Sequence, residues 1–498
     1  MHILFLKSLV SYKRARRRHT ATGGRSRVSE TTGSSRSTLE HAESCASSTS
    51  VRGRRAFCFS KFARDRLEKV EFQVDEKNDD IGGTRDAPVT FPLSATSSRG
   101  IGIPSGRIII PILPRFGGIS RVSFERDNLM KHIKLRHQII AAKWEEQEGL
   151  WHVRIHDEEQ GREFTDTCNV LVNGGGILNN WKWPDIAGLH SFQGVLQHSA
   201  HYTEGLDLKA AGSKIVVKIA SEVDHLYTWV RSPTWITAGF AQKFASNGGG
   251  NFEYTPIQKQ LFKENPKLYL KYSKMIESEL KQRFKFILKN TPESKAAKEY
   301  AIAEMKQKLA DNLESMEKMI PKDFDVDCQR PTLMHVLSSV LDFWPYAVIQ
   351  PGNGFLEALN RENVTVFTKL MTTVTSKGFI DHTGQEHEVD IIICATGRSF
   401  DTTWIPRFPV EANGTSLAKL WRNEAPSYLS VAPPSIPNYY MMGGPYRPLG
   451  YGSFLPILEI LARYIIQIID KMQTDRIKAL TPRVEAIARF KQHADLFL

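Results

Sequence analysis

Acidic and glycine residues at the ends of predicted strands are the features of this sequence that could bind a nucleotide. The alternating run Val70–Glu76 predicts a half-buried strand, and Glu76 is its last residue. A carboxylate in that position can accept hydrogen bonds from ribose hydroxyls. Gly82 and Gly83, followed by Thr84, would let the backbone approach a cofactor closely. The combination indicates a dinucleotide-binding unit, although a single Glu before a turn is common on protein surfaces.

A second glycine-rich turn follows an apolar strand. The run Cys168–Asn173 is uninterrupted by charge, as is typical of a strand buried in a parallel sheet. It leads directly into Gly174, Gly175 and Gly176, where the backbone is expected to pass close to another group.

These turns need a framework, and the surrounding patterns predict one. Alternating residues predict strands over 133–146, 149–157 and from residue 162 onward. The stretch 255–318 is rich in Glu, Lys, Leu and Ala, lacks glycine and predicts helices, more simply a structural lid than a binding surface. A helix with Ser60 as its N-cap is expected before the strand that ends at Glu76.

The C-terminal part predicts one more helix, and none of the sequence predicts a membrane span. Residues Phe454–Ile469 repeat apolar positions every three or four residues, which predicts an amphipathic helix packed on a core. Charged and polar residues interrupt this stretch, so it is too short and too polar to cross a bilayer.

Charge and cysteine content exclude several classes of protein. Of the 66 basic and 54 acidic residues, 12 and 3 lie in residues 1–60, a net of +9, and the remainder carries only +3. A body without excess positive charge argues against nucleic-acid binding. Five dispersed cysteines with no CxxC pair predict neither disulfides nor a metal site, and they suit a reducing, cytoplasmic location.

Residues 1–59 form a basic tail rich in Ser and Arg. That composition is typical of a mitochondrial transit peptide. The alternatives are a disordered tail, or sequence that is absent from the mature protein.

The stretch 170–202 resembles the flavin-dependent Baeyer–Villiger monooxygenases, especially the fungal branch associated with polyketide (aflatoxin- and sterigmatocystin-like) pathways. The family fingerprint is Phe-x-Gly-x3-His-x3-Trp. Phe192, Gly194 and His198 match it here, and Tyr202 replaces the final Trp.

The resemblance implies FAD and NADPH as cofactors. Arg231 and Ser232 follow the predicted strand Leu226–Val230, where the family holds the 2′-phosphate of NADPH; a guanidinium binds phosphate oxygens well. Thr396 and Gly397 end another apolar strand, at the family's second strand-to-glycine junction beside the flavin.

The resemblance also implies a reaction. In this family NADPH reduces FAD, and the flavin then activates O2 to attack a small-molecule ketone. The matching cation is Arg330, with Gln329 where the family usually has Lys or Arg, and His198 is the second catalytic candidate. Residues 444–453 match a close-packed loop near the flavin ring. Hydroxylation or heteroatom oxidation by the same cofactor is the alternative reaction.

Four departures from the family pattern weigh against this interpretation. Neither glycine-rich phosphate turn of such an enzyme is present, and only Lys218–Val223 separates the two strands expected around the NADPH turn. A parallel crossover needs about a dozen residues. Residues 85–122 lack the family pattern, and Leu333–Gln350 interrupts a normally continuous segment. Such joints suggest errors in the gene model or a decayed gene, so a non-catalytic remnant is the second hypothesis.

The resulting expectation is an α/β fold with two dinucleotide-binding (Rossmann-like) domains. An NADP-type domain, residues 205–365 with a helical insertion at 255–318, interrupts a discontinuous FAD-type domain, residues 60–204 and 366–498. The sequence leaves the oligomeric state open.

Overall fold

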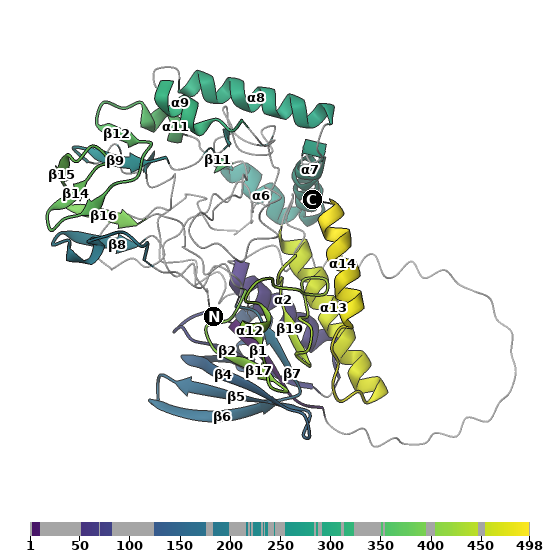
Figure 1. Ribbon diagram of the computed structural model, residues 1–498. Helices are drawn as coiled ribbons and strands as arrows, with labels where there is room; N and C mark the ends of the chain where they lie inside the picture. The colour runs from purple at the N-terminus through teal and green to yellow at the C-terminus, as the bar shows by residue number, and fades with distance from the viewer. Residues whose placement is uncertain are drawn as a thin grey trace, which may run out of the picture.

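The computed structural model shows two regions, each with its own buried cores (Figure 1). We call the described residues within 2–175 and 404–497 the large-sheet region, and those within 183–394 the paired-strand region. The structure describes residues 2–9, 51–68, 70–81, 124–175, 183–198, 216–217, 220, 223–230, 233, 235–237, 244, 254–282, 285–286, 291–309, 313–322, 350–351, 354–394, 404–446 and 454–497.

The large-sheet region is built on a five-stranded sheet with the order β19-β7-β1-β2-β3. β2 is parallel to β3 and β7 is parallel to β19, whereas β1 is antiparallel to both of its neighbours. Four strands therefore run in one direction, and their carboxyl ends lie at one edge. The strands are β1 His2–Leu9, β2 Val70–Glu76, β3 Ile133–Leu135, β7 Val170–Asn173 and β19 Tyr439–Met441.

Two parts of the predicted basic tail, residues 1–59, belong to this region instead. The apolar run near the N-terminus forms β1, the central strand of the sheet. Helix α2, Val51–Arg66, begins well before Ser60, which is buried within the helix and is not its N-cap. The helix begins earlier than predicted because Phe57, Cys58 and Phe59 are buried in the core. The free energy gained from burying them outweighs the polar composition around them.

Helices cover one face of this sheet. α2 and α13, Phe454–Asp475, pack on each other and on β2 and β7, as was predicted for the amphipathic C-terminal stretch. Alternate residues of β7 face opposite sides: Val170 and Val172 join this helical core, and Leu171 joins the core on the other face. α14, Val484–Phe497, follows α13 along the same side of the molecule (Figure 1).

A second five-stranded sheet, with the order β18-β17-β4-β5-β6, covers the other face. The predicted successive strands are present as β4, β5 and β6, and each pairs antiparallel with the next. Trp144, Trp151 and Tyr439 are buried between the two sheets. The elements are η2 Met130–His132, β4 His137–Glu145, β5 Leu150–Asp157, β6 Arg162–Cys168, β17 Val410–Ala412, β18 Thr415–Ser416 and α12 Leu417–Leu420.

In the paired-strand region the described strands form small sheets. β8 pairs with β16, β9 with β12, and β10 with β11, each in parallel, while β13, β14 and β15 form an antiparallel sheet. The elements are η4 Leu189–Ser191, β8 Val195–His198, β9 Leu226–Trp229, β10 Ile236–Thr237, β11 Gln350–Pro351, α11 Phe355–Leu359, β12 Val364–Phe367, β13 Thr373–Val374, β14 Gly378–Ile380, β15 Glu386–Glu388 and β16 Ile391–Cys394.

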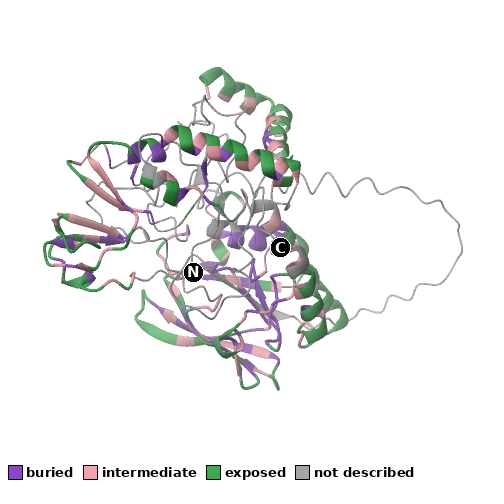
Figure 2. Ribbon diagram, turned by 45° about the horizontal axis from the view of Figure 1, so that its top comes forward, coloured by how far each residue is buried: buried purple, intermediate pink, exposed green. Residues whose placement is uncertain are grey.

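The helical insertion lies within this region and is mostly exposed on its outer side (Figure 2). Thr255 caps the first helix with a capping box. Its side chain accepts a hydrogen bond from the backbone N–H of Gln258, and the Gln258 side chain accepts one from the backbone N–H of Thr255. Thr291 similarly caps α8, whose Ala301 and Met305 face the core. The helices are α6 Pro256–Glu264, α7 Pro266–Gln282, α8 Pro292–Lys308 and α9 Leu313–Met319.

The cores divide the chain at positions other than those predicted. Phe192 packs with Phe367, Phe379 and Cys394, together with residues of β9. Residues 183–198 and 366–394, assigned from the sequence to the FAD-type domain, therefore pack with the strand that precedes Arg231.

The predicted strand before the NADPH turn also differs. Val216 and Val217 are helical, and the N–H of Ala220 donates to the carbonyl of Val216. No helix that the structure describes has both the length and the apolar character needed to cross a bilayer.

Candidate functional site

The carboxyl ends of the parallel strands in the large sheet converge on one edge. Glu76 ends β2, Asn173 ends β7, and Met441 ends β19. The register sets Glu76 opposite His2, Asn173 opposite the adjacent Ile3, and Met441 opposite Asn173. The three strand ends are therefore level, and this is the edge at which open α/β sheets bind their ligands.

Glu76 occupies the predicted place at this edge. The residue is buried, and its Oε1 accepts a hydrogen bond from the backbone N–H of Asn78 at 3.1 Å. Asn78 begins the turn that leads toward Gly82, Gly83 and Thr84, which lie outside the described residues. A carboxylate at a strand end beside such a turn has the chemistry required to bind ribose hydroxyls.

The turn after β7 is held by the side chain of Asn173. Its Oδ1 accepts from the N–H of Gly175 at 2.8 Å, and its Nδ2 donates to the Tyr439 hydroxyl at 2.8 Å. Burial raises the pKa of Tyr439, so this hydroxyl stays neutral. Gly174 and Gly175 thus lie at the predicted edge. This role of Asn173 was not predicted, although an Asn directly before a glycine run could have indicated it.

The segment after β19 packs closely at the same edge. The N–H of Gly444 donates to the carbonyl of Ser430 at 2.6 Å. A Cβ on Gly444 would lie 2.7 Å from Cε of Met441 and 3.0 Å from the Ser430 carbonyl oxygen. The absence of a side chain therefore allows the close packing predicted for the loop 444–453, whose residues 444–446 are described.

The described fingerprint residues, Phe192, Gly194 and His198, lie in the paired-strand region, before and within β8. A Cβ on Gly194 would lie 2.5 Å from the Asp390 carbonyl oxygen and 2.5 Å from Cζ of Phe192. Glycine is therefore required where the chain enters β8 beside buried Phe192. Gly194 and Phe192 thus have a packing role in the structure.

His198 is the last residue of β8 and is buried. Its ring lies edge-to-face with Trp183, with centroids 5.4 Å apart. Across the parallel pair it lies opposite Cys394, the last described residue before the junction at Thr396 and Gly397. Burial raises the pKa of the Cys394 thiol to about 11, which leaves it protonated and unreactive at neutral pH.

Several predicted site residues lie outside the described residues: Gly82, Gly83, Thr84, Gly176, Tyr202, Arg231, Ser232, Arg330, Thr396 and Gly397. β9 ends at Trp229, shortly before Arg231, and it is parallel to β12. The structure thus brings Glu76, Gly174 and Gly175 to one edge and places Phe192, Gly194 and His198 around a second strand pair.

The described residues fit the ribose end of FAD. A buried carboxylate and a constrained glycine turn lie level with each other at the correct edge. The pyrophosphate of FAD lacks a comparable site at the end of β1. This strand runs antiparallel to β2 and β7, so the last residue of β1, Leu9, lies at the opposite edge of the sheet. β1 and α2 therefore do not form a direct strand–turn–helix phosphate site. Any such contact would involve residues 10–50, outside the described residues.

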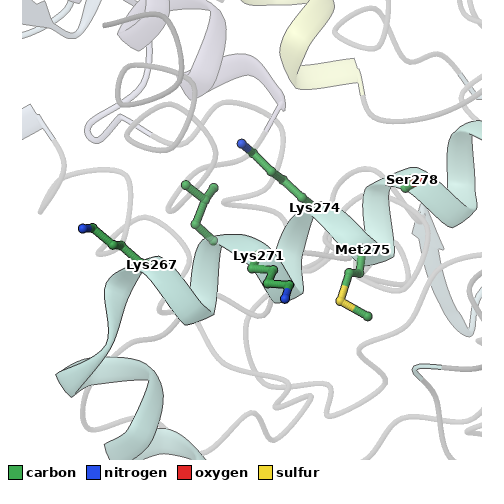
Figure 3. Close-up of a pocket in the computed structure, with 6 residues that line it drawn as sticks. Lys267, Lys271, Lys274, Met275 and Ser278 are labelled. Atoms are coloured by element: carbon green, nitrogen blue, oxygen red, sulfur yellow. The ribbon is translucent and has the colours of Figure 1, made fainter. Parts of the chain in front are cut away.

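An open hollow of about 450 Å³ lies elsewhere, along α7 (Figure 3). Lys267, Lys271, Lys274, Met275 and Ser278 line it together with Leu270. None of them is a predicted site residue. Within the described part of the chain, no group of three or more His, Cys, Asp or Glu residues could hold a metal ion.

The class of protein is evident from its relatives. No family model matches the sequence. The FAD-binding monooxygenase tazF of Aspergillus terreus is 29% identical over 452 residues, 86% of this chain and 75% of that protein. The FAD-binding monooxygenase stcW of Emericella nidulans is 28% identical over 454 residues, 85% of this chain and 70% of that protein. A Baeyer–Villiger monooxygenase of Pseudomonas aeruginosa is 25% identical over 381 residues, 74% of this chain and 66% of that protein.

Solved structures show the same architecture. Cyclohexanone monooxygenase in an open crystal structure has a TM-score of 0.66 at 20% identity, covering 89% of this chain and 90% of that one. OTEMO in complex with FAD and NADP has a TM-score of 0.68 at 19% identity, covering 90% and 88%. The predicted α/β fold with two dinucleotide-binding domains is confirmed. The chain is a homologue of FAD-binding monooxygenases, a Baeyer–Villiger monooxygenase among them, as the resemblance predicted.

Proposed function

We propose that this protein is an FAD- and NADPH-dependent monooxygenase that inserts an oxygen atom next to a ketone, in fungal secondary metabolism. The observation that carries the proposal is the convergence of Glu76, Gly174 and Gly175 at the carboxyl edge of the large sheet. The relatives, which are FAD-binding monooxygenases, support it. The OTEMO structure, which contains FAD and NADP, supports the pair of cofactors.

The cofactor contacts follow from the positions of the residues. Glu76 would accept hydrogen bonds from the ribose of FAD, while Gly174, Gly175 and Gly176 would let the backbone lie against the cofactor. Gly82, Gly83 and Thr84 would serve the same purpose after β2, and Thr396 and Gly397 after β16. Arg231 and Ser232 would bind the 2′-phosphate of NADPH.

The reaction assigns roles to two further residues. Bound FAD, reduced by NADPH, supplies the activated oxygen. One atom of O2 enters between the ketone carbon and its neighbour to give an ester. The other leaves as water, which takes up two electrons and one proton as hydride from NADPH and a second proton from solvent. Arg330 would provide a fixed positive charge for the negative charge that develops on oxygen. His198, at the end of β8, would be the second catalytic residue, and Phe192, Gly194 and Tyr202 would contribute to cofactor binding.

The extent of each domain is proposed from the cores. The FAD-type domain would comprise the large-sheet region and the NADP-type domain the paired-strand region, which moves residues 183–198 and 366–394 into the latter. We further propose a reducing, cytoplasmic location, because the described cysteines Cys58, Cys168 and Cys394 are buried thiols without disulfides.

Isotope labelling tests the reaction. The purified full-length chain, supplied with FAD, NADPH and a cyclic ketone under 18O2, is expected to yield a lactone with one labelled oxygen. Arg330→Ala is expected to abolish the lactone while leaving FAD binding within about twofold, since Arg330 acts only on the reacting atoms. A labelled alcohol in place of the lactone would identify the hydroxylase alternative, and a labelled amine oxide when an amine is supplied would identify the N-oxygenase alternative.

One observation favours a second candidate, a non-catalytic protein that keeps the fold. β1 fills the central position of the large sheet in the reverse direction, so its last residue, Leu9, lies at the edge opposite the carboxyl ends of β2 and β7. A folded chain that binds neither FAD nor NADPH would establish this candidate.

A further inference from the structure

A histidine lies between two aspartates next to the end of β2. Nδ1 of His137, in β4, lies 2.9 Å from Oδ1 of Asp75, in β2. Its Nε2 lies 3.8 Å from Oδ2 of Asp157, the last residue of β5. The side chains of Asp75 and Asp157 are 0% and 6% exposed, and that of His137 is 15% exposed. The imidazole therefore connects the two five-stranded sheets in a place nearly closed to water.

Asp75 depends on this histidine. Burial raises the pKa of Asp75, and the hydrogen bond and charge of His137 oppose that shift more than any other group. The Gln73 amide, 3.0 Å from Oδ1, is a weaker partner, and the carboxylate of Asp166 on β6 acts in the opposite direction. Removing the imidazole would leave the buried Asp75 carboxylate with only the Gln73 amide among its described hydrogen-bond partners. Such a loss lowers the stability of the folded protein.

Asp157 is a fixed anchor for the other side of the ring. Its Oδ1 accepts from the backbone N–H groups of Glu159 and Gln160 at 2.9 and 3.0 Å. These bonds, above all that from Gln160, lower the pKa of Asp157. The charge of nearby Arg162 lowers it further. The carboxylate is therefore charged at neutral pH and held by the turn between β5 and β6.

The backbone next to His137 reaches the segment that follows Glu76. Arg136 has a left-handed φ of 56°, unusual for a residue with a side chain. Its N–H donates to the carbonyl of Asn78 at 3.0 Å, and its carbonyl accepts from Glu158 at 2.9 Å. The N–H of Asn78 in turn donates to Oε1 of Glu76 at 3.1 Å. The His137 side chain thus holds Asp75, which precedes Glu76, and the Arg136 backbone holds Asn78, which follows it.

We propose that His137 is a positioning residue for Glu76. By its hydrogen bond to Asp75 between the two sheets, it fixes the end of β2 and holds the Glu76 carboxylate in the orientation needed to bind a ribose of an adenine dinucleotide. The identity of the ligand rests on the proposed function. The positioning itself is a property of the protein without cofactor and can be measured without one.

Amide hydrogen exchange of the cofactor-free protein tests the positioning. His137→Phe keeps a ring but removes both polar contacts, and it is expected to speed exchange of the Asn78 amide by about tenfold or more, because Glu76 Oε1 no longer stays in place. His137→Gln, which can still donate to Asp75, is expected to fall between His137→Phe and the unaltered protein. The control is His152→Phe: His152 pairs with Glu148 at 2.7 Å in the same sheet, but on an exposed site.

A double-mutant cycle with FAD tests whether the effect reaches the ligand. His137→Phe is expected to raise the Kd for FAD by about tenfold, and His152→Phe by less than about twofold. In the background of Glu76→Gln, His137→Phe should add less than about twofold, because it acts through the carboxylate already removed.

The outcomes separate the two proposals. Unchanged Asn78 exchange in a folded His137→Phe protein, or an equal change in His152→Phe, overturns the positioning role even when FAD binds. Faster Asn78 exchange in a protein that fails to bind FAD upholds the positioning role and rejects the proposed function. Should His137→Phe fail to fold, the His137→Gln protein decides by the same exchange measurement.

Discussion

The large-sheet region and the paired-strand region lack the same sequence feature, yet their sheets are not alike. Both lack a glycine turn between a first strand and a helix. The large-sheet region nevertheless has five strands in one sheet, with β1 in the central position. In the described part of the paired-strand region, the parallel strands occur only two at a time.

The different strand numbers of these sheets can be explained by the lengths of their connections. An antiparallel strand can enter a gap from any long connection, and the segment 10–50 supplies one between β1 and α2. In the other region only a short segment separates helical Val217 from β9, too short for a strand-to-strand crossover. The long connection after β1 thus allows it to lie antiparallel between β2 and β7, whereas the short segment before β9 allows no parallel crossover.

Replacing a tryptophan in each region should give the largest contrast. Trp151 is fully buried, donates to the carbonyl of Pro437 at 3.0 Å and contacts Trp144 and Tyr439. Trp151→Ala is expected to lower the free energy of unfolding by about 3–5 kcal/mol. Trp229 is half-buried against Phe367, at 5.2 Å between ring centroids, and Trp229→Ala should cost about 1–2 kcal/mol. Urea unfolding measures both; equal losses would mean that the two regions pack equally well.

Proline in a central strand should have the next largest effect. Phe5→Pro removes a backbone N–H from β1, between β2 and β7, and is expected to cost about 3 kcal/mol or more. Amide exchange should then rise in both neighbouring strands. Val366→Pro, in β12, should raise exchange only in β9 and its surroundings. If Phe5→Pro leaves β2 and β7 protected, β1 is not the strand that completes the sheet.

A glycine substitution tests the packing before β8. Gly194→Ala would place a methyl group 2.5 Å from the Asp390 carbonyl oxygen, so a loss of about 1–3 kcal/mol is expected. Gly161→Ala is the comparison, because a Cβ there meets nothing within 4 Å and only its positive φ of 61° is unfavourable. A loss at Gly194 no larger than that at Gly161 would contradict the tight packing of the fingerprint segment.

Two aspartate–histidine pairs, one in each region, should respond to pH in opposite directions. Asp381 and His387 are 2.9 Å apart, as are Asp75 and His137. Donation from the Thr383 hydroxyl, then from His387, holds the pKa of Asp381 well below its ordinary value of 3.8. Its contribution to stability is present above that ordinary value and is lost as the pH falls. Burial raises the pKa of Asp75, so its contribution is lost as the pH rises above 3.8.

Asparagine variants separate these slopes. Asp381→Asn should abolish the loss of protection that β14 and β15 show as the pH falls, while Asp75→Asn should abolish the decline that β2 shows as the pH rises. Amide exchange, corrected for its intrinsic pH dependence, measures each region separately. If protection changed with pH in the same direction in both regions, burial could not be the main cause of the pKa shift of Asp75 while hydrogen bonding is the main cause for Asp381.

Sequence patterns predicted what depends on local periodicity. The strands β4, β5 and β6, the helical insertion and α13 all follow from residue spacing, and so does the position of Glu76 at a strand end. β1 could not be predicted in this way, because its place depends on a gap between distant strands. The Asp75–His137 contact was missed for the same reason, since it joins two sheets that pack only in three dimensions.

FAD binding by the protein decides whether the edge formed by Glu76, Gly174 and Gly175 is a cofactor site. The purified chain is titrated with FAD and followed by quenching of flavin fluorescence, with Glu76→Gln as the paired variant. Saturable binding of one FAD per chain, weakened about tenfold or more in the variant, is predicted, because the buried carboxylate is the ribose ligand. A folded protein that binds no FAD, or binds it equally well without the Glu76 carboxylate, would contradict the account.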